Sequence, residues 1–424
     1  MPRSEIRIFL NYLPKASAFV VTNQAYNSAG NFLLTVWLIH RLGLTSFGFY
    51  VIYYLSGQSL MTLISALFVA PAASIAAMHD YLGRVQILVT AGLLAVLTLI
   101  VFLPLALAGS VAVSQLLSIE ISGPVLYLIT VSLTATEVAR RLLIYLDARF
   151  HIWALDLSRF GLLAGLLLWE VASASTASFE RLLVIVAASN IVTLAVLSIW
   201  RLKRVRVALS PTAFLDHAKR LLVTGKWLSI SALMQVINDN IFLFVGSALL
   251  GGQAVGVLRA SQSVVGLVNP LLLALENIIP RWLGEQARIG GKSQAMTAYW
   301  QVGSAIALVF TILLVVIAGF AGPFLARIAG PGAAPYVWVM QIICLTYMTG
   351  VLTVLVGFAF RTYEKTRPMA LSLFCSSLFA ACAAWPLVYF LGLPGLMLGI
   401  LTSGTVRLVT LVLQRRILLT EGAH

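Results

Sequence analysis

The sequence has little charge for its length. Only 10% of its 424 residues are charged, whereas 60% are hydrophobic. A soluble domain carries about 25% charged residues, so a chain with less than half that share cannot cover its surface in water. The apolar residues come in runs of about twenty, and not in short alternating segments, which is typical of helical membrane proteins. The composition therefore predicts an all-α polytopic membrane protein.

Signatures of soluble enzymes are also missing. The five histidines lack metal-ligand spacing, and the three cysteines, Cys344, Cys375 and Cys382, lie inside apolar runs. No Gly-x-x-x-x-Gly-Lys loop is present to hold nucleotide phosphates. We therefore expect no enzyme activity, metal or cofactor. The net charge of +14 fits basic residues gathered at the cytoplasmic membrane face better than it fits nucleic acid.

Hydropathy predicts twelve membrane spans. They cover roughly residues 16–38, 47–70, 85–108, 117–138, 152–170, 181–200, 225–248, 254–279, 298–320, 335–358, 368–391 and 394–414. If the N-terminus is cytoplasmic, most of the 28 Lys and Arg residues fall on the cytoplasmic side. The sequence thus predicts that both termini are cytoplasmic. The external connections are short, which leaves no aqueous segment large enough for a soluble active site.

The middle of the chain is its most polar stretch. Seven basic residues stand against one acid, Asp216, in residues 201–226. We interpret this stretch as a cytoplasmic strap between two lobes. The predicted division is an N-terminal six-helix lobe at 1–200, a basic linker at 201–224, and a C-terminal six-helix lobe at 225–424.

The two halves repeat short patterns. Gln24-Ala-Tyr-Asn27 in the first span matches Gln235-Val-Ile-Asn238 in the seventh, and the turn from Gly43 to Gly48 matches the turn from Gly251 to Gly256. Pro71 and Pro280 end the next spans. Three matches in the same order favour duplication. Because six spans separate the repeats, they should be related by an axis along the membrane normal.

Polar residues form a stripe on the first span and recur on the seventh. Asn23, Asn27 and Asn31 step by four, with Gln24 and Ser28 beside them, so they share one helix face. Such amides either bond to neighbouring helices or line a water-filled cavity, and their number favours a cavity. The matching residues on the seventh span are Ser231, Gln235, Asn238, Asp239 and Asn240.

Charged residues inside the spans leave two interpretations open. Asp239 is the most deeply placed acid, and it serves either a structural ion pair or a proton- or sodium-linked switch. Arg159, Arg259 and Arg407 either snorkel toward an interface or bind an anion such as phosphate. Two local pairs are expected, Asp156 with Arg159 one turn later and Glu137 with Arg140.

Both ends of the chain carry patterns of a known family. They are Gln24-Ala-Tyr-Asn-Ser-Ala-Gly-Asn31 with Arg41-Leu-Gly-Leu-Thr-Ser-Phe-Gly-Phe-Tyr50, then Phe360-Arg-Thr-Tyr-Glu-Lys-Thr-Arg-Pro368, and Gly392-Leu-Pro-Gly395-Leu-Met-Leu-Gly399. The chain resembles the bacterial polysaccharide transporter family over most of its length. These are lipid-linked oligosaccharide flippases of the multidrug/oligosaccharidyl-lipid/polysaccharide exporter (MOP) superfamily. The resemblance does not extend to flippases of peptidoglycan precursor, which have further helices and several arginines in the first two spans.

The resemblance implies a bacterial inner-membrane protein with two lobes forming a V around a central cavity. By alternating access it would move a polyprenyl-pyrophosphate-linked sugar unit to the periplasmic leaflet for exopolysaccharide synthesis. A polysaccharide polymerase and export machinery, membrane lipids and the lipid-linked oligosaccharide are the implied partners. The amides expected to contact the sugar are Asn23, Gln24, Asn27, Asn31, Gln235 and Asn238. Arg159 and Arg259 are expected to contact the pyrophosphate, and Asp239 is expected to couple transport to an ion.

Two other functions remain as alternatives. A cation-coupled multidrug efflux transporter of the same superfamily tends to use a carboxylate in the first span, and this chain has none between Glu5 and Asp80. A membrane glycosyltransferase or polymer ligase needs acids or large loops at the outer face, where only Glu120, Glu170 and Glu180 lie.

Overall fold

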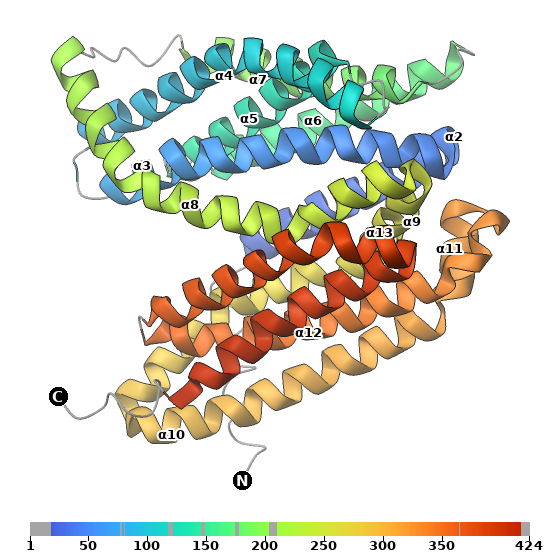
Figure 1. The fold of residues 1–424 in the computed structure, drawn as a ribbon. Helices are drawn as coiled ribbons and strands as arrows, with labels where there is room; N and C mark the ends of the chain where they lie inside the picture. Colours follow the sequence, from blue (N-terminus) through green and yellow to red (C-terminus); the bar gives the residue numbers. More distant parts are fainter. Residues whose placement is uncertain are drawn as a thin grey trace. The chain divides into compact units, whose positions relative to one another are not determined.

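The protein is almost entirely helical (Figure 1). The computed structural model describes residues 18–76, 79, 81–117, 122–145, 149–173, 178–202, 210–363 and 365–416. No β-strand occurs among these residues, which confirms the predicted all-α class.

The helices follow one another with short connections. In chain order they are α2 (Ala18–Ile64), the π-helix η1 (Ser65–Val69), α3 (Ala70–Ala76), α4 (Tyr81–Leu117), α5 (Gly123–Tyr145), α6 (Arg149–Ala172), α7 (Phe179–Leu202), α8 (Pro211–Leu250), α9 (Gly252–Val265), η2 (Gly266–Val268), α10 (Asn269–Gly319), α11 (Ala321–Ala329), η3 (Pro331–Tyr336), α12 (Val337–Thr362), α13 (Thr366–Leu413) and η4 (Gln414–Arg416).

Three of the longest helices contain two passes joined by a glycine. Gly43 in α2, Gly291 in α10 and Gly392 in α13 have φ of 72°, 79° and 62°, with non-helical ψ. Residues with a Cβ atom rarely adopt such backbone angles, so glycine permits the chain to reverse at each position. With these breaks, the described residues of the predicted spans lie in helices except Ser122 and Phe320.

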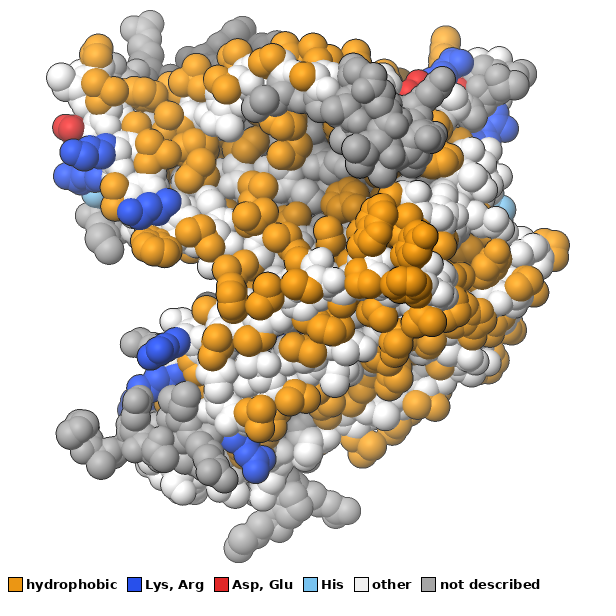
Figure 2. Space-filling view, in the orientation of Figure 1, with side chains coloured by type: hydrophobic (Ala, Val, Ile, Leu, Met, Phe, Trp, Pro, Cys, Tyr) orange, Lys and Arg blue, Asp and Glu red, His pale blue; other side chains and the backbone are white. Residues whose placement is uncertain are grey.

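Nine helical segments of the described chain are long and apolar enough to cross a membrane. The helix α5 is not among them, because Glu137, Arg140 and Arg141 make its second half polar. On the face drawn in Figure 2, hydrophobic side chains cover the lengths of the helices and many Lys and Arg side chains lie near the helix ends. Large apolar residues such as Trp169 and Val309 are exposed, as expected of surfaces that contact lipid.

The chain forms two compact units, which are described separately. Unit 1 contains Met1–Gly48 and Ile237–His424, and unit 2 contains Phe49–Val236. The predicted lobes follow the sequence repeat, whereas these units follow contacts, and their boundaries lie inside α2 and α8. The first pass of α2 therefore belongs to the same unit as the C-terminal helices.

Unit 2 has an apolar core where α2, η1, α3 and α4 meet the start of α8. Phe68, Ala72, Ile87 and Leu221 are buried in it. The helix α8 approaches η1 backbone to backbone, since a Cβ at Gly225 would lie 1.9 Å from the carbonyl oxygen of Leu67. This close approach fixes the beginning of α8 on unit 2.

In unit 1, the two repeated glycine turns pack against each other. A Cβ at Gly48 would lie 1.8 Å from the carbonyl oxygen of Gly252, and a Cβ at Gly256 would lie 2.1 Å from that of Leu44. The residue pairs 43/251, 44/252 and 48/256 have the same separation along the chain, and both Gly43 and Gly251 have positive φ. The contact is therefore reciprocal, which supports the inferred duplication.

This contact also corrects the alignment of the polar stripes. With the register of the glycine turns, Asn27 corresponds to Gln235 and Asn31 corresponds to Asp239. The sequence comparison had matched Asn27 with Asn238 instead. The error arose because short polar patterns on a helix can be shifted by nearly one turn without leaving the same face.

Candidate functional site

A polar network surrounds Asn238 in unit 1. Its Oδ1 accepts hydrogen bonds from the hydroxyls of Ser376 and Ser403, the second at 3.1 Å. Its Nδ2 donates to Oδ1 of Asp239 at 2.9 Å. Both serines are buried, so Asn238 joins α8 to the two passes of α13.

Small residues allow these helices to approach. A Cβ at Gly399 of α13 would lie 2.0 Å from Cε1 of Phe242, and one at Gly246 of α8 would lie 2.3 Å from Cδ1 of Leu396. The reversal at Gly392 returns α13 past itself. As a result, Ser376 and Ser403, far apart in sequence, reach the same amide.

Charged groups lie at the edge of this network. Asp239 is exposed and interacts electrostatically with Arg407 of α13 and with Tyr347 of α12. Tyr347 also forms a hydrogen bond with Asn269 of α10 and lies in the field of Arg259 of α9. Unit 1 thus gathers one carboxylate, two guanidinium groups, amides and hydroxyls from five helices.

Two ion pairs of unit 2 involve arginines of α5. Arg140 Nε lies 3.5 Å from Oδ2 of Asp156 on α6, and the Asp156 side chain is fully buried. Arg141 donates to Glu137 one turn before it. The pairs 137/140 and 156/159, which the sequence suggests, stay predictions. The observed partners follow from α5, where residues four apart share a face and Arg140 points to α6.

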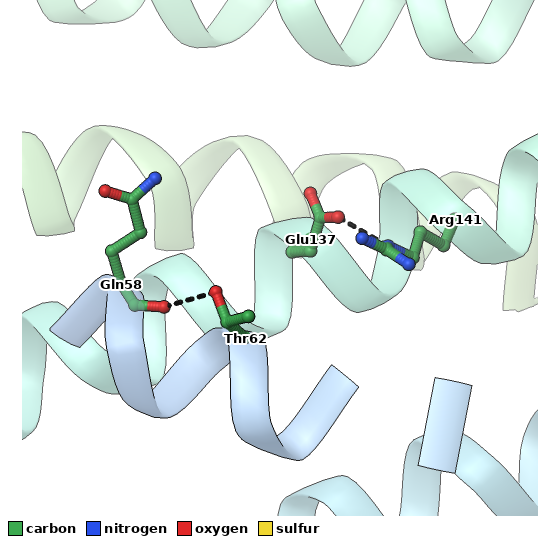
Figure 3. Close-up of polar contacts among 4 residues, drawn as sticks. All are labelled: Gln58, Thr62, Glu137 and Arg141. Atoms are coloured by element: carbon green, nitrogen blue, oxygen red, sulfur yellow. Dashed lines mark hydrogen bonds and ion pairs between the residues drawn. The ribbon is translucent and has the colours of Figure 1, made fainter. Parts of the chain in front are cut away.

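A polar surface flanks the second of these pairs. Figure 3 shows Gln58 of α2 and Glu137 of α5 with side chains directed to the same side. The helices are close there, because a Cβ at Gly57 would lie 3.3 Å from Oγ1 of Thr130 and 3.4 Å from Cδ1 of Leu133. The Glu137 and Arg141 side chains are 21% and 38% exposed. An amide and a neutralised ion pair are therefore available on this surface.

The predicted site residues are divided between the units. Unit 1 brings together Asn238, Asp239 and Arg259. Gln235 belongs to unit 2 and is half-buried, as is Arg159, whose guanidinium lies 4.5 Å from the centre of the Phe160 ring.

The first polar stripe contains both buried and exposed members. In unit 1, Asn27 is buried and Asn31 is exposed. The side chains of Asn23 and Gln24 lie outside the part that the structure describes.

Sequence reasoning missed several members of the network. Ser376, Ser403, Asn269 and Tyr347 come from spans that carry no conspicuous stripe. The only signal was a polar side chain within an apolar run. This signal is weak, because a hydroxyl in a helix often donates a hydrogen bond to a backbone carbonyl of the same helix, as Ser377 does to Leu373.

The same architecture occurs in solved structures. The inward-facing conformation of a multidrug resistance MATE family transporter of the MOP superfamily matches over 100% of both chains, with a TM-score of 0.71 and 15% identity. The chain has the MATE transporter fold. An outward-facing conformation of a multidrug resistance MATE family transporter matches over 98% of this chain and 96% of that chain (TM-score 0.61, 14% identity).

A eukaryotic MATE transporter matches over 98% of this chain and 96% of that chain, with a TM-score of 0.59 and 15% identity. No protein-family model and no curated protein matches the sequence. The MATE fold of these relatives accounts for the helical composition and for the full-length match. At such identities it carries over no substrate and no site residue.

Proposed function

We propose that the protein is an alternating-access transporter that moves a lipid-linked oligosaccharide across the bacterial inner membrane. The observation that carries this proposal is the charge balance of its intramembrane polar groups. The polar surface of unit 2 combines an amide with a neutralised Glu137–Arg141 pair. The network of unit 1 combines Asn238 with two serine hydroxyls.

These groups suit a neutral, hydroxyl-rich cargo. Amides, carboxylates and guanidinium groups donate to and accept from sugar hydroxyls. A surface that binds organic cations would instead present excess negative charge, because an opposite charge at close range is what distinguishes a cation from a sugar. The polyprenyl tail of the cargo can stay in lipid, so only its head needs a polar path.

Two arginines are proposed to bind the pyrophosphate of the cargo. Guanidinium groups bind phosphate oxygens in a bidentate manner. In unit 1, Arg259 donates to Gln262 Oε1 at 3.3 Å, which orients its side chain, and in unit 2 Arg159 is half-buried. Asp239 is the proposed coupling residue, because it is an exposed acid in a membrane helix and lies in the electrostatic field of Arg407.

A cation-coupled multidrug transporter is the second candidate. One specific observation favours it, the exposed carboxylate of Asp239 in a membrane helix. The described residues give less support to a glycosyltransferase or polymer ligase. Glu170, one of the few acids at the expected outer face, is buried and paired with Arg181 at 3.0 Å, so it is not accessible as a catalytic acid.

The direct test is reconstitution of the purified protein in vesicles with a fluorescent polyprenyl-pyrophosphate oligosaccharide. Movement of the sugar between leaflets would be followed by its accessibility to an impermeant lectin, and dye-cation efflux would be measured in parallel. We expect sugar movement that falls about tenfold or more in E137Q/R141Q, equivalent to about 1.4 kcal/mol.

The matched control is E276Q/R361Q, which removes another exposed ion pair between α10 and α12. It should keep sugar movement near the wild-type rate. Efflux of a cationic dye without any movement of the sugar lipid would overturn the proposal in favour of the multidrug candidate.

A further inference from the structure

The helix α8 is too long to lie wholly in a membrane. Its 40 residues rise about 60 Å, twice the thickness of a hydrocarbon core of about 30 Å. The charged residues are concentrated in its first four turns, so the excess length lies at that end. Figure 1 shows these first turns running across the direction of the other helices of unit 2 before α8 bends into that direction.

One face of this segment, residues 211–226, is attached to unit 2. Ala218 and Leu221 are buried, and Leu221 belongs to the apolar core formed with η1 and α4. Gly225 makes the backbone contact with Leu67. At the start, the Ser210 hydroxyl accepts a hydrogen bond from the amide of Ala213 at 3.2 Å, which caps the helix. The segment is therefore held in a fixed orientation.

A neighbouring, exposed side of the helix carries an alternating apolar and basic stripe. Leu215, Lys219, Leu222 and Lys226 are spaced by four, three and four residues, so they lie along one side of the helix. All four are exposed, with Leu215 at 64% and Leu222 at 45%. Beside this stripe, Arg220 is also exposed. We call Leu215, Lys219, Leu222 and Lys226 the lipid stripe.

We propose that the lipid stripe binds anionic phospholipids of the adjacent leaflet. The leucines would contact the acyl chains, while the lysines extend their ammonium groups to the headgroups, as long basic side chains do at interfaces. Each basic residue near an anionic surface adds to the attraction. The charge determines the occupant, because Asp216 is the one acid among the described residues of this segment and zwitterionic lipid has no net charge to attract.

Trp227 offers a native probe for this binding. It is 67% exposed, and the Lys226 ammonium lies 5.7 Å from its ring centre. The full-length protein would be reconstituted in phosphatidylcholine/phosphatidylglycerol vesicles that carry bromine on only one of the two lipids, at equal bromine content. The fluorescence of W227F is subtracted to isolate the quenching of Trp227.

We expect quenching of Trp227 to be about twofold stronger when bromine is on phosphatidylglycerol, because two lysines attract that lipid. K219Q/K226Q should remove the excess, whereas R288Q/R415Q, which removes two exposed arginines elsewhere, should retain it. Inorganic phosphate at constant ionic strength should leave the excess unchanged.

Three outcomes would overturn the proposal. They are equal quenching from the two lipids, loss of the excess in R288Q/R415Q, and displacement of the lipid by inorganic phosphate. The last result would indicate a site for small free anions. None of these outcomes bears on whether the protein moves a sugar lipid, so this test can fail while the proposed function stands.

Discussion

The two units hold their intramembrane charges in different ways. In unit 2, Asp156 is buried against Arg140 and Glu170 is buried against Arg181. In unit 1, Asp239 is exposed at the edge of an amide and hydroxyl network. A buried acid that is paired with an arginine resists loss of its charge, because that loss leaves the arginine without its partner. An exposed acid can gain or lose a proton or a cation at lower cost.

This difference assigns separate tasks to the two units. The ion pairs of unit 2 fix α5 against α6 and α6 against α7, so they hold the helices in one arrangement. The network of unit 1 links α8 to α13 through Asn238, and its acid, Asp239, is exposed. We therefore expect substitutions of the buried acids Asp156 and Glu170 to act mainly on stability, and substitution of Asp239 to act mainly on transport.

The largest expected effect is that of Asp156→Ala. It should lower the free energy of unfolding by about 3 kcal/mol, since the Arg140 charge, which is 26% exposed, remains without its buried partner. Thermal unfolding in detergent measures this change, and R140A/D156A should recover part of the loss. The comparison between the units breaks down if Asp239→Ala is equally destabilising.

The next effect concerns the attachment of α8 to unit 2. Gly225→Ala should destabilise the protein by about 2 kcal/mol, because the new methyl group would overlap the carbonyl oxygen of Leu67. Gly165→Ala is the control, since nothing lies within 4 Å of that position. Thermal unfolding of both variants should show a loss for the first and no loss for the second.

Asp239→Asn is expected to separate transport from folding. The variant should keep its stability within about 1 kcal/mol, because its network partner Asn238 can bond to an amide as well. The transport rate in vesicles should fall at least about tenfold if the charge of Asp239 couples the cycle to an ion. A wild-type rate in a well-folded variant would remove Asp239 from the coupling role.

The smallest expected effect on stability is that of Glu137→Gln. A partly exposed pair four residues apart on a helix contributes about 0.3–0.5 kcal/mol, so thermal unfolding should hardly change. A loss of several kcal/mol would mean that this pair resembles the buried pair of Arg140 and Asp156, and would contradict its assignment to a surface that meets cargo.

The sequence was a reliable guide to helices and reversals. Long apolar runs indicate spans because the bilayer sets their length, and Gly43 and Gly251 marked turns that need positive φ. Partners across helices were beyond its reach. The ion pair between Asp156 and Arg140 was not predictable, because the orientation of α5 against α6 decides which residues of the two helices meet.

The candidate site was predictable only in part. Amide stripes pointed to α2 and α8, where Asn238 and Asp239 do occupy a polar network. Whether a given amide is buried, as Asn27 is, or exposed, as Asn31 is, depends on neighbours that no local pattern specifies. Ser403 reaches Asn238 only because Gly392 reverses α13.

The reciprocal contact of Gly48 with Gly252 and of Gly256 with Leu44 has the form of an interface between two identical subunits. In a symmetric homodimer, if residue i of the first copy contacts residue j of the second, then residue j of the first copy contacts residue i of the second. An ancestral chain half as long, assembled as a homodimer, would already have had this contact between glycine turns. Any bulky replacement of its single glycine would have damaged the assembly at two places at once, whereas after fusion each glycine became free to mutate alone.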